Sequence, residues 1–128
     1  MNPREIVKGA KTTLESQGFH GIYLRRLDEM TGKEGIVIRL LPITRTDTHF
    51  DLSECLEIPY QIIARFRSDS EAFDECSKAV ELLEHRTYPL DGGYLTDQEV
   101  YTYPQELELS ESGFFAYEAR LAAQVTRY

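Results

Sequence analysis

The sequence has few cysteines and no long apolar run. Its 128 residues include two cysteines, Cys55 and Cys76, and no stretch of eighteen consecutive apolar residues. Two cysteines without CxxC spacing are too few for a disulfide scaffold, so we expect both to be reduced thiols. The N-terminus lacks the basic and then apolar layout of a secretory signal. These absences predict a protein that stays in the cytosol and has no membrane-spanning segment.

Basic residues are also scarce. The chain carries 14 Lys and Arg against 22 Asp and Glu, a formal net charge of −8. Tight binding to nucleic acid depends on basic side chains that displace counterions, so specific DNA binding is not expected. The charge is unevenly distributed: residues 1–45 hold eight basic and five acidic residues, a net +3, and residues 46–128 hold six and seventeen, a net −11.

Motifs that carry catalysis are missing too. The sequence contains no GxxxxGK[ST], GxGxxG, HExxH or GxSxG pattern. The histidines His20, His49 and His85 are scattered, without the spacing of a zinc site, and surface positions explain them best. Cys76 lies on an apolar helical stripe, which favours a buried, unreactive thiol over a nucleophile. We therefore predict no enzymatic activity, no cofactor and no metal.

Two amphipathic helices are predicted. The first covers Pro3–Gln17, with Asn2 and Glu5 placed to form a capping box and Gly18 as the stop. The second covers Asp69–His85 behind a capping box at residues 68–71. Each helix carries an apolar stripe at helical spacing. The stripes are Ile6, Val7, Ala10 and Leu14 in the first helix, and Ala72, Phe73, Cys76, Ala79, Val80 and Leu83 in the second.

Five segments have the pattern of β-strands: Ile22–Arg26, Gly35–Leu41, Cys55–Arg67, Glu99–Leu109 and Phe115–Val125. The third gives the clearest alternation. Its inward set is Leu56, Ile58, Tyr60, Ile62, Ala64 and Phe66, and its outward set includes Cys55, Glu57, Gln61, Arg65 and Arg67. Pro59 argues against a central position for its part of this strand, because proline cannot donate to the ladder.

The order of these elements is helix, three strands, helix, two strands. Short connections favour a mostly antiparallel sheet of about five strands, with two helices packed on one face. We therefore predict an α+β fold that forms a single domain over residues 1–128. The other face of the sheet is left for water or a partner.

Several stretches resemble one known family. They are Tyr60–Phe66 with the capped helix that follows, Gly93–Leu95, Tyr101–Gln105 and the closing strand Phe115–Val125. In this order they resemble the minor capsid and tail-terminator proteins of tailed bacteriophages. The similarity covers nearly the whole chain, as a pattern of elements and apolar positions without a diagnostic motif.

The resemblance implies a structural, non-enzymatic virion protein without a cofactor. Such proteins form a ring, commonly a hexamer, at the head-proximal end of the tail, where they stop growth of the tail tube and join it to the head connector. The implied partners are further copies of the chain, the tail-tube protein and head-connector proteins. The implied location is the virion, and the host bacterial cytoplasm during assembly. DNA would pass through the ring without specific binding, and an acidic inner wall would keep phosphates from adhering.

Interface residues are predicted in three groups. The basic candidates are Arg25, Arg26 and Arg39; the polar loop Thr44–Asp51 adds Thr46, Asp47, His49 and Asp51; and Tyr101 and Tyr103 supply large contact area with polar tips. An ordinary solvated surface explains the arginines nearly as well.

Reversing the charge of Arg25 and Arg26 together is expected to weaken assembly, because opposite net charges steer two different patches together in a ring. Native mass in solution measures the effect. Unchanged assembly of the double variant would remove both arginines from the interface.

Two other classes stay open. One is a small acidic cytosolic regulatory or inhibitory protein that captures a basic partner such as a nuclease. The other is an enzyme that uses an acidic cleft and a metal, although no ligand spacing indicates one.

Overall fold

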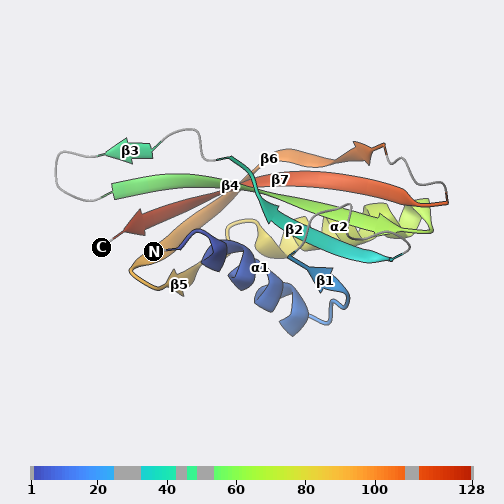
Figure 1. The fold of residues 1–128 in the computed structure, drawn as a ribbon, viewed down its shortest axis with the longest axis horizontal. Coiled ribbons are helices and arrows are strands. Elements are labelled where there is room, and N and C mark those ends of the chain that lie inside the picture. Colours follow the sequence, from blue (N-terminus) through green and yellow to red (C-terminus); the bar gives the residue numbers. More distant parts are fainter. Residues whose placement is uncertain (1, 25–32, 43–45, 49–53, 109–112, 128) are drawn as a thin grey trace.

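A computed structural model describes residues 2–24, 33–42, 46–48, 54–108 and 113–127. In chain order the elements are α1 (Arg4–Ser16), β1 (Ile22–Tyr23), β2 (Gly35–Leu40), β3 (Thr46–Thr48), β4 (Glu54–Phe66), α2 (Asp69–Leu83), β5 (Tyr88–Leu90), β6 (Gly93–Leu107) and β7 (Phe115–Arg127) (Figure 1). Among the described residues, no helix has the length and apolar character needed to span a bilayer.

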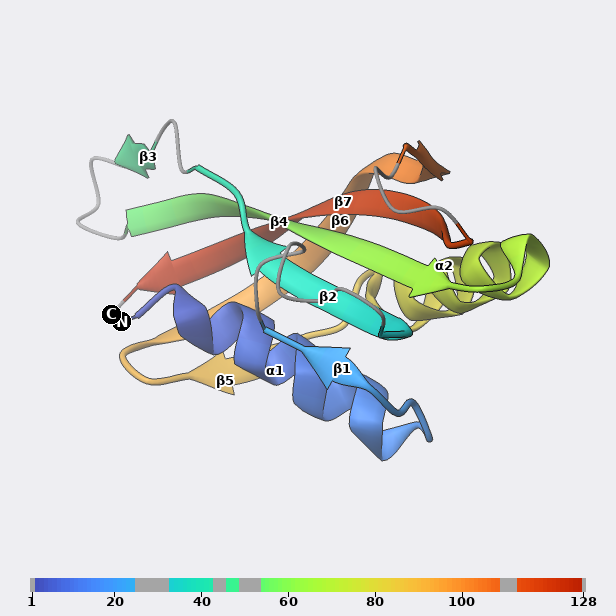
Figure 2. The same ribbon diagram turned by 45° about the vertical axis from the view of Figure 1, so that its right-hand side comes forward.

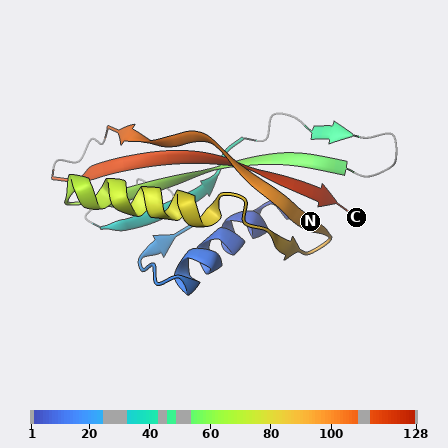
Figure 3. The same cartoon turned by 180° about the vertical axis from the view of Figure 1, so that it is seen from behind.

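The strands form one strongly twisted sheet in the order β1-β2-β4-β7-β6-β5, with β3 also paired to β4 (Figure 2). All pairings are antiparallel except β1 with β2. The long strands β4 and β7 pair along their whole length, from Glu54 opposite Arg127 to Phe66 opposite Phe115. Both helices pack on one face (Figure 3). The predicted α+β class and layer arrangement are confirmed.

The prediction was wrong about the number and ends of the strands. Residues 46–48, predicted as part of a polar loop, form β3 against Glu54–Leu56, because two β-branched threonines suit a short edge strand. β5 was not predicted at all. The turn at Asp91 and Gly92 joins β5 to β6, which therefore begins at Gly93, six residues before the predicted start at Glu99.

The capping box predicted for α1 is present. The backbone N–H of Arg4 donates to Asn2 Oδ1 at 3.0 Å, and the N–H of Asn2 donates to Glu5 Oε2 at 3.2 Å. Glu5 also accepts from the backbone N–H of Asp91 through its other oxygen, at 3.0 Å. The cap therefore ties the start of α1 to the turn between β5 and β6.

α2 begins as predicted but ends earlier. Ser68 Oγ accepts from the N–H of Glu71 at 3.4 Å, and the helix stops at Leu83, two residues before the predicted end. His85 has a φ of 63°, in the left-handed region, and its N–H donates to the Gln98 carbonyl at 2.9 Å. This backbone bond to β6 ends the helix.

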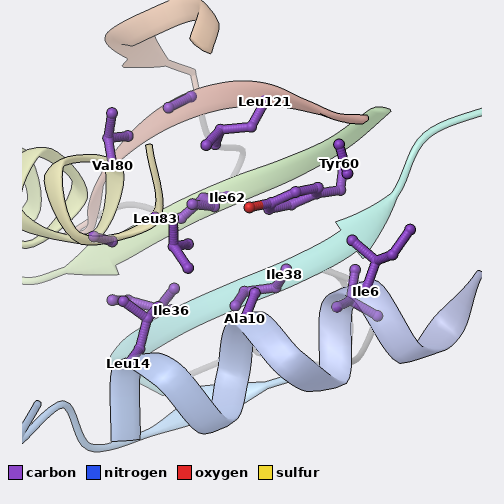
Figure 4. Close-up of a cluster of buried hydrophobic side chains, with 14 of the residues drawn as sticks. Ile6, Ala10, Leu14, Ile36, Ile38, Tyr60, Ile62, Val80, Leu83 and Leu121 are labelled. Carbon is purple, nitrogen blue, oxygen red and sulfur yellow. The ribbon is translucent and has the colours of Figure 1, made fainter. Parts of the chain in front are cut away.

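The main core lies between the helices and the sheet. Every residue of the predicted α1 stripe is buried, and the α2 stripe is buried except for Phe73, which is exposed. Figure 4 shows Leu14 of α1 and Leu83 of α2 on either side of Ile36, with Tyr60 further along β4 in the same cluster. Tyr60 is fully buried, and its hydroxyl donates to Gln98. Full burial of each large apolar side chain in this core contributes on the order of 2 kcal/mol to the free energy of unfolding.

Pro59 lies where β4 has no ladder partner on one side, as predicted for its part of the strand, although β4 as a whole is central in the sheet. Its carbonyl accepts from the N–H of Leu41 at 3.0 Å, so its nitrogen also points toward the side of β2. The ladder with β2 ends at Tyr60, and the ladder with β3 begins only at Leu56. Proline fits here because it falls in the gap, where no ladder bond is lost.

The second face of the sheet is not simply open. Val37, Ile63 and Ala116 are buried there, and Tyr23 and Leu107 pack against them. The prediction that this face is left for water or a partner is therefore wrong at its centre. The signal in the sequence was Ile63, an apolar residue in the outward set of β4.

Cys76 is fully buried in the main core, as predicted. Desolvation, and then the charge of Glu118, raises the pKa of its thiol to about 12. In a Cys55→Ser chain at about pH 8, we expect native Cys76 to be inert to a disulfide-exchange reagent, because the reactive thiolate is scarcely populated. A colorimetric thiol assay measures this, with denatured protein as the reactive control. Stoichiometric labelling at the rate of a free thiol under native conditions would contradict the burial of Cys76.

Candidate functional site

A row of polar side chains crosses the face of the sheet opposite the helices. Arg39 Nε of β2 donates to Gln61 Oε1 of β4 at 2.7 Å, and Gln61 Nε2 donates in turn to Glu118 of β7. Gln105 Nε2 of β6 donates to the other oxygen of Glu118 at 2.7 Å. We call Arg39, Gln61, Glu118 and Gln105 the polar row. It joins four neighbouring strands by side chains alone.

The centre of the polar row is buried. Gln61 is 2% exposed and Glu118 is 4% exposed. A buried carboxylate is stable only when donors satisfy it, and Glu118 has two amide donors as well as Arg120 Nη2 at 3.5 Å. Among the described residues, Arg120 Nε is a buried nitrogen without a hydrogen-bond partner.

A second basic group lies near the end of the same face. Arg65 is nearly fully buried, with its guanidinium 3.9 Å from the centre of the Phe114 ring and one nitrogen donating to the Lys33 carbonyl at 2.8 Å. Arg67 lies 4.5 Å from the same ring. These contacts anchor the start of β7 against the end of β4.

Beside the polar row the surface is hollowed. The hollow has a volume of about 410 Å³ and is lined by Leu41, Pro42, Glu57, Pro59, Tyr101 and Arg120. The lining combines apolar side chains and the Tyr101 ring with one basic residue, Arg120, and one acidic residue, Glu57. This chemistry suits a polypeptide segment better than a compact, highly charged ligand.

Tyr101 and Tyr103, predicted together as interface residues, lie on different faces of the sheet. The pairing of β6 with β7 shifts between Val100 and Thr102 and again between Thr102 and Gln105. A bulge re-aims the side chains around it. Tyr101 therefore lines the hollow beside Arg120, whereas the Tyr103 hydroxyl donates to Glu84, just after α2, at 3.3 Å.

A strip of aromatic and acidic side chains runs along one flank of α2. Phe73 packs edge-on against Tyr117 of β7, with ring centres 5.3 Å apart. The Tyr117 hydroxyl donates to Asp69 at 2.8 Å. We call Asp69, Phe73, Glu84, Tyr103 and Tyr117 the α2 strip. Phe73 is 44% and Tyr103 63% exposed, so the strip presents two large rings to solvent.

The predicted interface residues are spread over these features. Arg39 belongs to the polar row, Tyr101 to the hollow and Tyr103 to the α2 strip. Thr46 and Asp47 lie in β3, on the sheet and not in a loop. Four further candidates lie outside the described residues: Arg25, Arg26, His49 and Asp51.

Sequence reasoning missed the centre of the polar row. Gln61 was placed in the outward set of its strand, which is correct for its side of the strand but not for its burial. Phe73 was assigned to the core, although it lies at the edge of the helical stripe. The alternation in a strand identifies a face, and only tertiary contacts decide whether that face is covered.

His85 forms an exposed pair with Asp97, with Nδ1 2.9 Å from Oδ1. The hydrogen bond to Asp97 is the main cause that raises the pKa of His85, and the charges of Asp97, Glu84 and Glu99 act in the same direction. Because the pKa of His85 is higher in the folded than in the unfolded state, protonated His85 contributes its full stabilisation below the ordinary histidine pKa of about 6.5. This contribution is lost as the pH rises through the pKa of the folded state.

We therefore expect the His85 resonances in an NMR titration to move at a higher pH than in an Asp97→Asn variant. Stability of the wild type relative to that variant should fall across the same interval. Identical titration of His85 in the two proteins would show that the pair does not form in solution.

Among the described residues, no three His, Cys, Asp or Glu side chains gather as a metal site would require. Comparison with models of known protein families and with curated proteins finds no match for this chain.

Proposed function

We propose that this chain is a structural subunit of a bacteriophage or prophage tail. In this proposal it forms a ring at the head-proximal end, stops growth of the tail tube and joins the tail to the head connector. It acts on no substrate and uses no cofactor; its partners are its own copies and the proteins above and below the ring.

The fold is the observation that carries the proposal. Two helices on one face of a mostly antiparallel sheet, with α2 directly after the long strand β4 and a hairpin of long strands at the end, is the arrangement that the family resemblance implies. Large side chains left exposed on both faces add support, because aromatic residues are enriched where proteins meet. They include Phe73, Tyr101, Tyr103 and Phe115.

The charge on α2 supports a conduit wall and also a second candidate function. Glu71, Asp74 and Glu81 are exposed on this helix, against a single lysine, Lys78. An acidic surface repels DNA in a channel. The same surface favours the alternative of a small regulatory protein that captures a basic partner.

Electron microscopy and native mass measurement test the proposal, with the chain alone and with tail-tube protein from the same genome. We expect multimeric rings that cap the tubes and limit their length. A monomer that leaves tube growth unchanged would overturn the proposal. Recovery of a basic nuclease from host lysate, in place of tail proteins, would support the regulatory alternative.

A further inference from the structure

The two flanks of α2 differ in what covers them. One flank faces the C-terminal end of α1, where Gln17, Phe19 and His20 share a hollow of about 350 Å³ with Glu71 and Glu75. The opposite flank carries the α2 strip. In the described part of the chain, the Phe73 and Tyr103 rings of that strip stay 44% and 63% exposed.

The α2 strip has the chemistry of a contact surface for cations. It extends from Asp69 to Glu84, roughly 20 Å along the helix. The carboxylates at its two ends accept hydrogen bonds from the Tyr117 and Tyr103 hydroxyls, which fixes both rings in place. Rigid aromatic rings beside carboxylates bind ammonium and guanidinium groups by cation–π attraction and ion pairing. Exposed Asp74 and Glu81 add negative charge on the same helix.

The matching surface is on α1. Arg4, Lys8 and Lys11 recur at positions i, i+4 and i+7, along one side of the helix next to its buried stripe. Arg4 and Lys8 are exposed, Lys11 is half-buried, and Glu5 is engaged in the cap and the Asp91 bond. This side of α1 is therefore basic for about two turns, before the exposed Glu15.

We propose that the α2 strip of one copy binds the basic side of α1 of a second copy. The two surfaces are different patches of the same molecule, so the contact is head-to-tail and closes into a ring when the rotation between copies allows it. The α1 of the next copy then covers the free flank of α2, as the chain's own α1 covers the other. This inference rests on the proposed function only in that both require contact between copies.

Isotope-resolved cross-linking tests the contact. Equal amounts of unlabelled and ¹⁵N-labelled full-length chain are mixed at high concentration, and a carbodiimide joins amines to carboxylates that form ion pairs. Mass spectrometry then separates links between copies from links within one. We expect mixed-isotope links from Lys8 or Lys11 to Asp69, Asp74 or Glu84. Mixed-isotope links that join only other surfaces, or none at all, would overturn the inference.

Matched variants check that the links report a specific surface. Arg4→Glu, which keeps both reporting lysines, should lower the yield of these links at least tenfold, while Lys33→Glu, with the same charge change elsewhere, should leave it within twofold. Phe73→Ala should act like Arg4→Glu, and Tyr94→Ala, which removes another exposed ring, should not. Circular dichroism confirms that each variant is folded. Equal yields in Arg4→Glu and Lys33→Glu would contradict the proposed contact.

The outcome separates this inference from the proposed function. If copies assemble and cap tail tubes but the links join other surfaces, the inferred contact is wrong and the proposed function is supported. If tubes are never capped although the predicted links form, the inferred contact is supported and the proposed function is wrong.

Discussion

Replacing Glu118 with leucine is expected to lower the free energy of unfolding by about 2–3 kcal/mol, because the change leaves the nearly buried Gln61 amide without its acceptor. Gln61→Leu should cost a similar amount, since it leaves the Glu118 carboxylate with fewer donors in a buried setting. Chemical denaturation followed by circular dichroism measures both losses.

The double variant distinguishes the polar row from ordinary packing. With Gln61 and Glu118 both replaced by leucine, neither is left unpaired, and two apolar side chains join the cluster around Ile63. We expect the double variant to be at least as stable as either single variant, a coupling of about 2 kcal/mol or more. Additive losses would show that the two side chains do not depend on each other.

Gly35→Ala is expected to cost about 3 kcal/mol. A Cβ at this position would lie 2.3 Å from the Gly21 carbonyl oxygen and 2.9 Å from the Tyr23 ring. Gly21 cannot withdraw, because its carbonyl accepts from the N–H of Ile36 at 2.9 Å, the bond that leads into the parallel pairing of β1 with β2. The added methyl group would therefore push β1 and β2 apart.

Gly18→Ala is the matched control for Gly35→Ala. Gly18 also has a positive φ, 93°, but a Cβ there meets nothing within 4 Å. Only backbone strain is added, so the loss should be about 1 kcal/mol. Thermal denaturation compares the two variants. Equal losses would mean that the close approach of β1 to Gly35 is absent in solution.

The sequence identified those parts of the fold that depend on local periodicity. The α1 stripe and its cap were predicted residue by residue, because the spacing of apolar residues in an amphipathic helix shows which side is buried. The alternation in β4 likewise gave the faces of that strand. Two helices and long antiparallel strands then allow few layer arrangements.

Features that depend on partners in space were not predictable in this way. β3 and β5 are short edge strands whose pairing compensates for weak or contrary local signals, such as Pro89 in β5. The bulges in β6 separate Tyr101 from Tyr103; Pro104 signals an irregularity in the second of them, but only the pairing with β7 shows its register. The burial of Gln61 depends on a donor from β2 and an acceptor from β7.

Sedimentation velocity of the full-length chain tests the central claim, that its exposed aromatic and charged surfaces meet other copies. The measurement covers rising protein concentration at about 0.05 M and 0.5 M salt, since screening weakens contacts between opposite charges. We predict species at multiples of the 14.8 kDa monomer that grow with concentration and decline at high salt. A single monomeric species at every concentration and both salt levels would contradict the account.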